Sequence, residues 1–258
     1  MSKSKRQKLE DGFEVNPDDL DEIDSLFFDG GDSPHQERVR RRPSRIVAVI
    51  SPKGGTGKTS VAVMLAGTLK TQRRKTGLMD IDPRQGVERW AHAGNGLPFP
   101  TYTFNAKRGA AAFRRAIRDA IKEVDLLIID TPSTMGSAIG LSLQVSDLVL
   151  IPAGASTLDL EAAQEAIDAA KEAQHGRDGD LPRLMVVPSR LDARTRIARD
   201  FARRFKELKV SVAPAVGQRV EVAAAANSGR LVRPGTVAGQ EFRALSRYVW
   251  TSLRQLDE

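Results

Sequence analysis

The sequence predicts an α/β fold, a doubly wound and mostly parallel sheet with helices on both faces. From Arg45 onward, short apolar β-branched runs alternate with longer segments of helical periodicity, as expected for strands joined by crossover helices. A glycine-rich turn, residues 53–60, separates the first apolar run from the first helical pattern. The length of 258 residues allows one such domain of about 200 residues and an extension.

The expected elements follow in order along the chain. Apolar runs predict strands near residues 45–51, 76–81, 125–130, 147–152, 183–188 and 209–213. Helical patterns fall near residues 58–72, 108–122, 157–174, 195–207, 219–228 and 238–256. Ligands of parallel sheets bind at the carboxyl ends of the strands, and residues 51–59, Asp82 and Asp130 all fall at such ends.

Residues 1–44 predict an extension before a domain that covers residues 45–258. Residues 1–37 hold four basic and eleven acidic residues, a net charge of −7, and this composition predicts disorder. Within the extension, Leu20, Ile23 and Phe27 share one helical face. This segment could dock a partner protein, pack within the molecule or do neither. The acidic residues of the extension could also compete with DNA for binding to the basic rest of the chain.

Composition narrows the function classes. The chain has no Cys, which excludes disulfides, thiolate metal sites and a cysteine nucleophile. No stretch approaches the roughly 18 apolar residues of a membrane span, and the N-terminus lacks a signal-peptide core, so we expect a cytoplasmic protein. After residue 37, 36 basic and 22 acidic residues give a net charge of +14, which favours an anionic polymer such as DNA as a partner.

The turn between the first strand and the first helix predicts a phosphate cradle, because glycine lets backbone N–H groups approach an anion. Lys58 would neutralise the β and γ phosphates, and the Thr59 hydroxyl would bind Mg²⁺. The strict motif has Gly where this chain has Pro52, and a second lysine, Lys53, begins the loop. The candidate nucleotide-binding residues of the loop are Gly54, Gly55, Thr56, Gly57, Lys58, Thr59 and Ser60.

A lysine at the start of the loop resembles the deviant Walker A loop of the ParA/MinD family of P-loop ATPases. Other segments resemble the same family over about residues 45–256, most closely its short-type partition ATPases and related cargo-positioning ATPases. These segments are Asp80-Ile81-Asp82-Pro83, Trp90, residues 125–132 with Asp130, residues 149–152 and residues 216–220.

The resemblance implies that ATP and Mg²⁺ bind and that ATP closes a homodimer. Lys53 would cross the dimer interface to the partner's nucleotide, and Asp82 would orient the attacking water. Thr59 would hold Mg²⁺ directly and Asp130 through water, with Asp82 as a further magnesium candidate. Asp80 would either support Asp82 or contact the magnesium waters.

Two positions depart from the family pattern. The family usually has Gln directly after Asp-Pro, whereas Arg84 stands here and Gln85 follows, so either residue could sense the nucleotide. The family often has Asn at the end of the sixth strand, where it contacts adenine, but this chain has Pro188-Ser189-Arg190. Preference for ATP over GTP therefore follows from the resemblance alone.

Arginines recur where a DNA surface is expected. Arg196, Arg199 and Arg203 share one face of a predicted helix, Arg219 resembles a DNA-contacting arginine of partition ATPases, and Arg230 follows in a loop. Contacts from such residues to phosphates give affinity without sequence readout. A cationic helix face can also be merely solvated, so the three arginines of the helix could either contact DNA or only face solvent.

Together these features predict an ATPase switch that binds nucleoid DNA nonspecifically and drives plasmid or chromosome partition or positions a cargo. A ParB-like or cargo adaptor protein would stimulate hydrolysis, which is expected to be slow without it. The alternatives are a membrane-recruited, MinD-like ATPase and a metabolic P-loop enzyme. The apolar stripe of residues 242–253 could serve a membrane, but the acidic end of the chain favours packing on the sheet.

Overall fold

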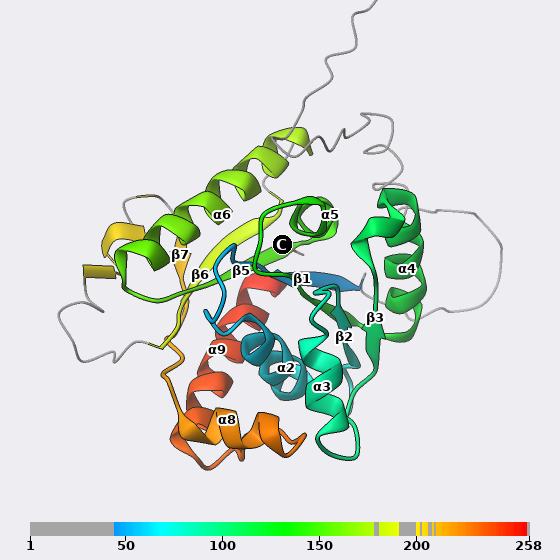
Figure 1. Cartoon of the computed structure of the whole chain (residues 1–258), viewed down its shortest axis with the longest axis vertical. Helices are drawn as coiled ribbons and strands as arrows, with labels where there is room; N and C mark the ends of the chain where they lie inside the picture. Colours follow the sequence, from blue (N-terminus) through cyan, green and yellow to red (C-terminus); the bar gives the residue numbers. More distant parts are fainter. Residues whose placement is uncertain are drawn as a thin grey trace, which may run out of the picture.

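The computed structural model describes residues 44–177, 181–190, 200, 201, 203–205, 208 and 210–256 (Figure 1). Except for Ser44, the predicted extension lies outside the described residues. Arg196, Arg199 and most of the predicted helix 195–207 also lie outside them. The boundary between extension and domain therefore stays a prediction.

Seven parallel strands form one sheet in the order β3-β2-β4-β1-β5-β6-β7. This sheet, with helices on both faces, confirms the predicted fold class. The strands are β1 (Arg45–Val49), β2 (Thr76–Asp80), β3 (Thr101–Thr103), β4 (Leu126–Asp130), β5 (Leu148–Ala153), β6 (Arg183–Pro188) and β7 (Ser211–Val212).

Strand register brings the acidic residues together. β4 lies between β2 and β1, with Asp80 of β2 opposite Asp130 of β4. On its other side, Asp130 is opposite Val49, the last residue of β1. The carboxyl ends of these three strands therefore meet at the edge where the chain leaves β1 to form the glycine-rich loop, as expected for ligand sites on parallel sheets.

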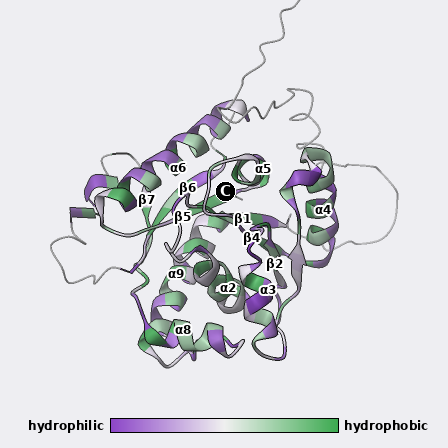
Figure 2. Ribbon diagram, viewed as in Figure 1, coloured by the Kyte–Doolittle hydropathy of each residue, from purple (hydrophilic) through white to green (hydrophobic). Residues whose placement is uncertain are grey.

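Two helical layers cover the sheet (Figure 1). Because successive side chains of a strand point to opposite faces, Ile46 and Ala48 pack under one layer, whereas Val47 and Val49 pack under the other. Figure 2 shows the apolar strands between helices whose outer faces are polar, most clearly on α6 and α4. One layer holds α4 (Ala110–Glu123), α5 (Ser137–Val145) and α6 (Thr157–Gly176), and the other holds α2 (Lys58–Leu69), α3 (Gly86–His92), α8 (Val220–Asn227) and α9 (Val237–Arg254).

Several short elements are absent from the sequence prediction. β3 is a three-residue edge strand, and α3 has only seven residues, so neither gives a readable period. α5 is buried around most of its circumference, which removes the amphipathic pattern that marks a helix. A single 3₁₀ turn, Ala106–Arg108, precedes α4, and β7 is shorter than the predicted strand at residues 209–213.

The apolar stripe of α9 packs against the sheet and α2. Phe242, Leu245, Val249 and Leu253 are each at most 1% exposed and belong to the core beneath that layer. The stripe is therefore used in folding, as the sequence favours. Among the helices that the structure describes, none combines the length and the hydropathy needed to cross a membrane.

Candidate functional site

The loop between β1 and α2 has the backbone shape of an anion cradle. Gly55 and Gly57 have positive φ angles of 75° and 94°, which glycine adopts without strain. Gly57 is the N-cap of α2, and no side chain caps the helix, so the first amides of α2 are open to an anion. Gly54 and Gly55 are exposed, and Ser60 is half-buried in the first turn of α2.

Two neighbouring elements hold the loop in shape. Thr56 is buried, and its carbonyl accepts a hydrogen bond of 2.8 Å from the hydroxyl of Ser189, which follows β6. The Thr56 hydroxyl donates to the carbonyl of Lys53 at 3.4 Å. The cradle is therefore preformed by the fold rather than left to a bound ligand to organise.

Lys58 points into the loop and is only 5% exposed. Its ammonium donates to the Lys53 carbonyl at 3.1 Å and to the Ser133 hydroxyl at 2.9 Å. Burial lowers the pKa of Lys58, while the nearby carboxylates of Asp130 and Asp82 oppose that shift. A positive charge thus lies inside the cradle with two carboxylates near it.

Asp130 is buried at the end of β4 and lacks a full set of partners. One carboxylate oxygen accepts a hydrogen bond of 2.7 Å from the Thr59 hydroxyl. The other, Oδ1, has no hydrogen-bond partner among the residues that the structure describes. Burial raises the pKa of Asp130 to about 8; the hydrogen bond from Thr59 opposes the shift, and neighbouring Asp80 adds to it.

Asp80 is also buried, but both of its oxygens are occupied. Oδ1 accepts from the backbone N–H of Asp82 and Oδ2 from that of Val87, each at 2.9 Å. Burial raises the pKa of Asp80, and these backbone hydrogen bonds oppose the shift. Of the two roles considered for Asp80, the geometry favours supporting the loop that carries Asp82.

Asp82 begins a tight turn that leads into α3. Its carboxylate accepts from the N–H of Arg84 at 2.9 Å, and its carbonyl accepts from the N–H of Gln85 at 2.8 Å. Gln85 has a left-handed backbone, with φ of 52°, and is the N-cap of α3. Both Arg84 and Gln85 are exposed, so both are accessible to a nucleotide.

The residues present fit a magnesium ion and a polyphosphate. A hydroxyl and a carboxylate at the N-terminus of α2, with one buried oxygen unpaired, are hard oxygen donors of the kind that Mg²⁺ prefers. The adjacent amides and Lys58 would neutralise phosphate oxygens. The structure thus brings together Lys58, Thr59, Asp82 and Asp130 at one edge of the sheet.

Lys53, the other lysine of the loop, turns to α6 rather than into the loop. Its ammonium pairs with Asp159 of α6 at 2.7 Å and lies 3.4 Å from the Ser156 hydroxyl. Ser156 and Asp159 form a capping box at the start of α6. Burial alone would raise the pKa of Asp159, but the hydrogen bonds from Lys53 and Ser156 outweigh burial and hold that pKa below its usual value.

Of the predicted DNA-contacting arginines, the structure describes Arg203, Arg219 and Arg230. Arg203 pairs with Asp200 at 2.9 Å, and Arg219 pairs with Glu241 at 2.5 Å. Arg219 caps α8 and Arg230 follows its other end, with α8 between them spanning about 12 Å. The structure therefore brings Arg219 and Arg230 to one helix, and leaves Arg203 elsewhere in the chain.

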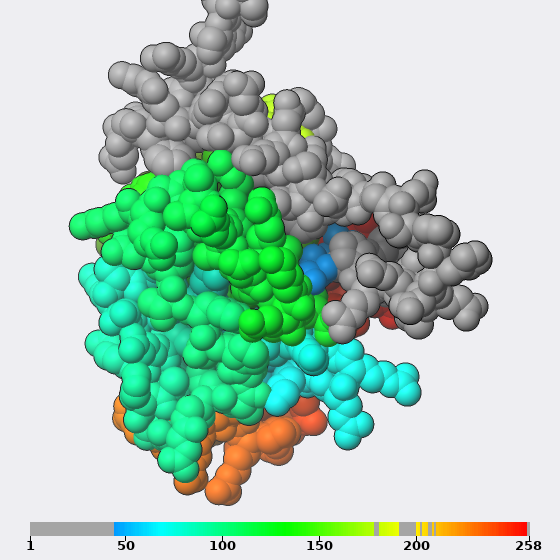
Figure 3. Space-filling model, turned by 90° about the vertical axis from the view of Figure 1, so that its right-hand side faces the viewer, coloured from blue at the N-terminus to red at the C-terminus, as the bar shows by residue number. Residues whose placement is uncertain are grey.

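α3 connects the acidic edge to the loop that follows α8. The Trp90 indole donates to the carbonyl of Arg230 at 3.0 Å. Gly94 and Gly229 approach so closely that a methyl group on either would meet the backbone of the other segment. In Figure 3 the orange atoms of the α8 region lie at the bottom of the molecule, against the teal-green atoms of the α3 region.

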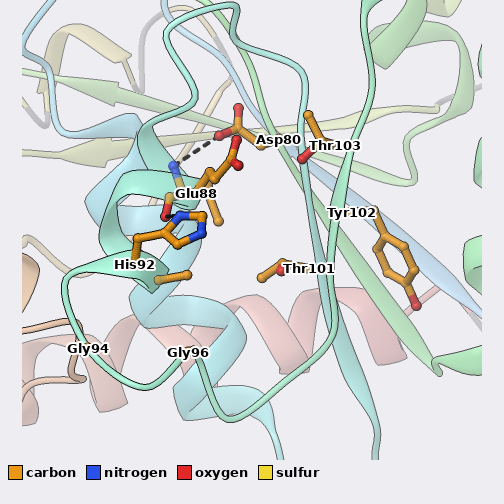
Figure 4. A pocket seen from close by; sticks show the side chains of 10 residues that line it. Asp80, Glu88, His92, Gly94, Gly96, Thr101, Tyr102 and Thr103 are labelled. Atoms are coloured by element: carbon orange, nitrogen blue, oxygen red, sulfur yellow. Dashed lines mark hydrogen bonds between the residues drawn. The ribbon is translucent and has the colours of Figure 1, made fainter.

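A cavity of about 320 Å³ lies between α3 and β3 (Figure 4). Asp80, Glu88 and His92 line one side, and Thr101 and Thr103 face them from β3. The cavity lies behind Asp80 rather than over the glycine-rich loop, and its lining includes neither Lys58 nor Thr59. It is therefore separate from the phosphate cradle.

Sequence reasoning missed several partners of the site. Asp159 had a readable signal, because Ser156-x-x-Asp159 before a helical pattern has the spacing of a capping box. Ser133 and Glu241 gave none, and no local pattern showed that Ser189 would reach Thr56, since each contact forms only when the fold brings together residues far apart in the sequence.

Comparison with known proteins agrees with this geometry. Residues 47–232 match the family described as the CobQ/CobB/MinD/ParA nucleotide binding domain. The chain is 32% identical over 128 residues to maintenance of carboxysome distribution protein A of Gloeobacter kilaueensis, covering 48% of this chain and 55% of that protein. It is 25% identical over 205 residues to chromosome partitioning protein ParA of Myxococcus xanthus, covering 63% and 70%.

A solved structure shares the fold. Cobyrinic acid a,c-diamide synthase from Mycobacterium smegmatis, with bound ATP analog and magnesium, superposes with a TM-score of 0.64 at 19% identity. The superposition covers 83% of this chain and 95% of that one. At this identity the likeness shows the fold alone, so the choice between a switch and a metabolic enzyme rests on the residues of the site.

Proposed function

Because the chain belongs to the CobQ/CobB/MinD/ParA nucleotide-binding domain family, we propose that it is an ATP-dependent dimeric switch that partitions DNA or positions a cargo. ATP binds the cradle and closes a homodimer, the dimer binds nucleoid DNA nonspecifically, and hydrolysis releases it. A ParB-like or cargo adaptor protein stimulates that hydrolysis. The Gloeobacter and Myxococcus relatives, named for carboxysome distribution and chromosome partitioning, support this kind of function.

The observation that carries the proposal is that the two lysines of the loop have different partners. Lys58 fills the cradle, so the phosphates of the bound nucleotide are already neutralised from within. Lys53 is turned to α6 and is held by Asp159 of the same chain. To reach the nucleotide of a second copy, as the resemblance implies for a lysine at this position, Lys53 would exchange this ion pair for the partner's phosphates.

Each residue of the site has a defined part in the cycle. The amides of residues 55–59 and the Lys58 ammonium bind the phosphates, and Asp82 orients the attacking water. Thr59 and Asp130 would hold Mg²⁺, which neutralises charge on the phosphate oxygens when bound. Asp80 accepts a hydrogen bond from the backbone N–H of Asp82 and so positions Asp82.

The membrane-recruited alternative loses its main sequence support in the structure. It needs an amphipathic helix with an apolar face free to enter a lipid surface. The apolar face of α9 is buried against the sheet and α2. The metabolic alternative needs a small-molecule pocket beside the phosphates, and the cavity behind Asp80 does not open onto Lys58 or Thr59.

The test of the proposal is the Lys53→Ala variant. We expect it to bind ATP with nearly native affinity, because Lys58 and the loop amides stay in place, yet to remain monomeric with a non-hydrolysable ATP analogue. Size-exclusion chromatography with light scattering measures this. Lys122→Ala is the matched control, because it removes a lysine from an exposed ion pair, and it should dimerise normally. Normal dimerisation of Lys53→Ala would contradict the proposal.

DNA binding gives a second test. Binding should require ATP, tolerate any sequence and weaken with salt, since each phosphate neutralised contributes about 0.9 to the log–log salt slope. Replacing Arg219 and Arg230 together with alanine should weaken binding to all sequences alike and flatten that slope. Fluorescence anisotropy with DNA duplexes of unrelated sequence measures both effects.

The matched control removes the same charge from another surface. Arg115 and Arg118 are exposed on α4, on the other side of the sheet from α8, and replacing both with alanine should change DNA binding little. Equal losses in the two double variants would mean that only net charge matters. Strong preference for one DNA sequence would also count against the proposed surface.

A further inference from the structure

The amino ends of the strands form the edge of the sheet opposite the phosphate cradle, and basic residues gather at this amino edge. Three of them lie in the turn between α2 and β2. The end of α9 reaches the same edge, because Arg183, the first residue of β6, donates to the carbonyls of Ser252 and Gln255. We call five side chains of the turn and of α9 the amino-edge cluster: Arg73, Arg74, Lys75, Arg247 and Arg254.

Arg74 joins the two parts of the cluster. Its guanidinium carbon lies 3.5 Å from the centroid of the Trp250 ring, at stacking distance. On α9, Arg247 stands three residues before Trp250 and Arg254 four residues after it, so these three side chains share one helix face. Arg247 and Arg254 are exposed, and they flank the place where Arg74 stacks.

The positive charge of the cluster is not balanced locally. Among the described residues, no carboxylate forms an ion pair with any of its five members. Nη1 of Arg74 is buried and has no hydrogen-bond partner in the part of the chain that the structure describes. Burial lowers the pKa of Arg74, and the carboxylate of Asp125 opposes that shift while accepting from the N–H of Lys75. Further carboxylates at this surface would therefore be stabilised.

The N-terminal extension joins the domain beside this cluster. The Ser44 hydroxyl donates to two carbonyls at the end of α4. Arg45 of β1 and Thr76 of β2 are both in register with Leu126 of β4, so the starts of β1 and β2 are two strand spacings apart, roughly 10 Å. Figure 3 faces this part of the molecule and shows the blue start of β1 above the cyan turn before β2.

We propose that the amino-edge cluster is the docking surface for residues 10–37 of the same chain. These residues contain eleven acidic side chains and no Lys or Arg, so their charge complements that of the cluster. Glu37 is seven residues before Ser44, a span of up to roughly 25 Å, which covers the distance between the start of β1 and the turn before β2. The tether gives an effective concentration on the order of millimolar, which favours this segment over other polyanions.

Carbodiimide crosslinking of the full chain tests this docking without nucleotide, because the reagent joins a carboxylate to a lysine amine in contact with it. Mass spectrometry should find Lys75 linked to carboxylates of residues 10–37, whereas Lys171, on α6, should not be linked to them. In a mixture of ¹⁵N-labelled and unlabelled protein, both linked peptides should come from one copy. About 1 M salt should abolish the links, since the Debye length is then only about 3 Å.

Charge reversal shows whether the cluster attracts the segment. Arg73→Glu combined with Arg247→Glu reverses two exposed charges and leaves Lys75 in place as the reporter. The yield of Lys75 links should fall at least about tenfold, because each reversal replaces an attraction with a repulsion. Arg230→Glu combined with Arg233→Glu, the matched control, reverses two exposed arginines after α8 and should give the native yield. Thermal unfolding checks that both double variants are folded.

Three results would overturn the inference. Native yield of Lys75 links after the reversal of Arg73 and Arg247 would mean that the acidic segment is held elsewhere, for example by the arginines of residues 38–42. Links only between different copies would make the occupant a second molecule. Loss of the links in the Arg230 and Arg233 control alone would place the segment on the proposed DNA surface. Failure of the proposed function is a separate outcome, because this docking requires neither ATP nor DNA.

Discussion

Replacing Lys58 with alanine is expected to abolish nucleotide binding. The ammonium is buried in the loop and is the one side-chain cation that donates into it from within, among the residues that the structure describes. Charge-assisted hydrogen bonds of this kind contribute about 3 kcal/mol, so affinity for ATP should fall by roughly 100-fold or more. Titration calorimetry with ATP and Mg²⁺ measures the loss.

A control separates this loss from damage to the loop. Lys58→Ala also removes the hydrogen bond to Ser133. Ser133→Ala removes the same hydrogen bond but keeps the charge, and it should bind ATP within about threefold of the native protein, since a neutral partner contributes about 1 kcal/mol or less. If the two variants lose the same affinity, the role of Lys58 is structural and its assignment to the phosphates is wrong.

Replacing Asp82 with alanine should separate binding from hydrolysis. Asp82 orients the attacking water in the proposed cycle, whereas the cradle and the Thr59–Asp130 pair do not depend on its side chain. The variant should bind ATP and dimerise, yet hydrolyse at least about 100-fold more slowly, the lower range for loss of a group that handles the water proton. It should therefore remain bound to DNA.

Phosphate release under single-turnover conditions measures the hydrolysis step, and anisotropy follows DNA retention. Asp119→Ala, which removes an exposed carboxylate of α4, should hydrolyse at the native rate. Turnover of Asp82→Ala at the native rate would show that another group positions the water. Asp80 is a poor substitute, since both of its oxygens already accept from backbone N–H groups.

The sequence predicts well those features that depend on residues close together in the chain. The strand, glycine turn and helix around Lys58 lie within about 25 residues, and their chemistry follows from residue type and spacing. β1, β4 and β5 are buried on both faces and appear as continuous apolar runs. Local pattern and tertiary demand agree in these segments.

What the sequence could not predict depends on contacts between distant segments. Asp159 is 106 residues from Lys53, and only the sheet order places α6 beside the start of the loop. The role of Asp80 depends on which backbone N–H groups reach its two oxygens. From its position two residues before Asp82, a carboxylate could either support Asp82 or contact the magnesium waters, and only these hydrogen bonds distinguish the two roles.

The clamping of α3 at both ends has a thermodynamic consequence. At its N-terminal end, Asp80 accepts from Val87, and at its C-terminal end Trp90 donates to the carbonyl of Arg230. A shift of the acidic edge would therefore be passed through this short helix to the segment that carries Arg230. By thermodynamic linkage such coupling is reciprocal. If bound nucleotide raises the affinity for DNA at Arg230 by some factor, bound DNA raises the affinity for nucleotide by the same factor.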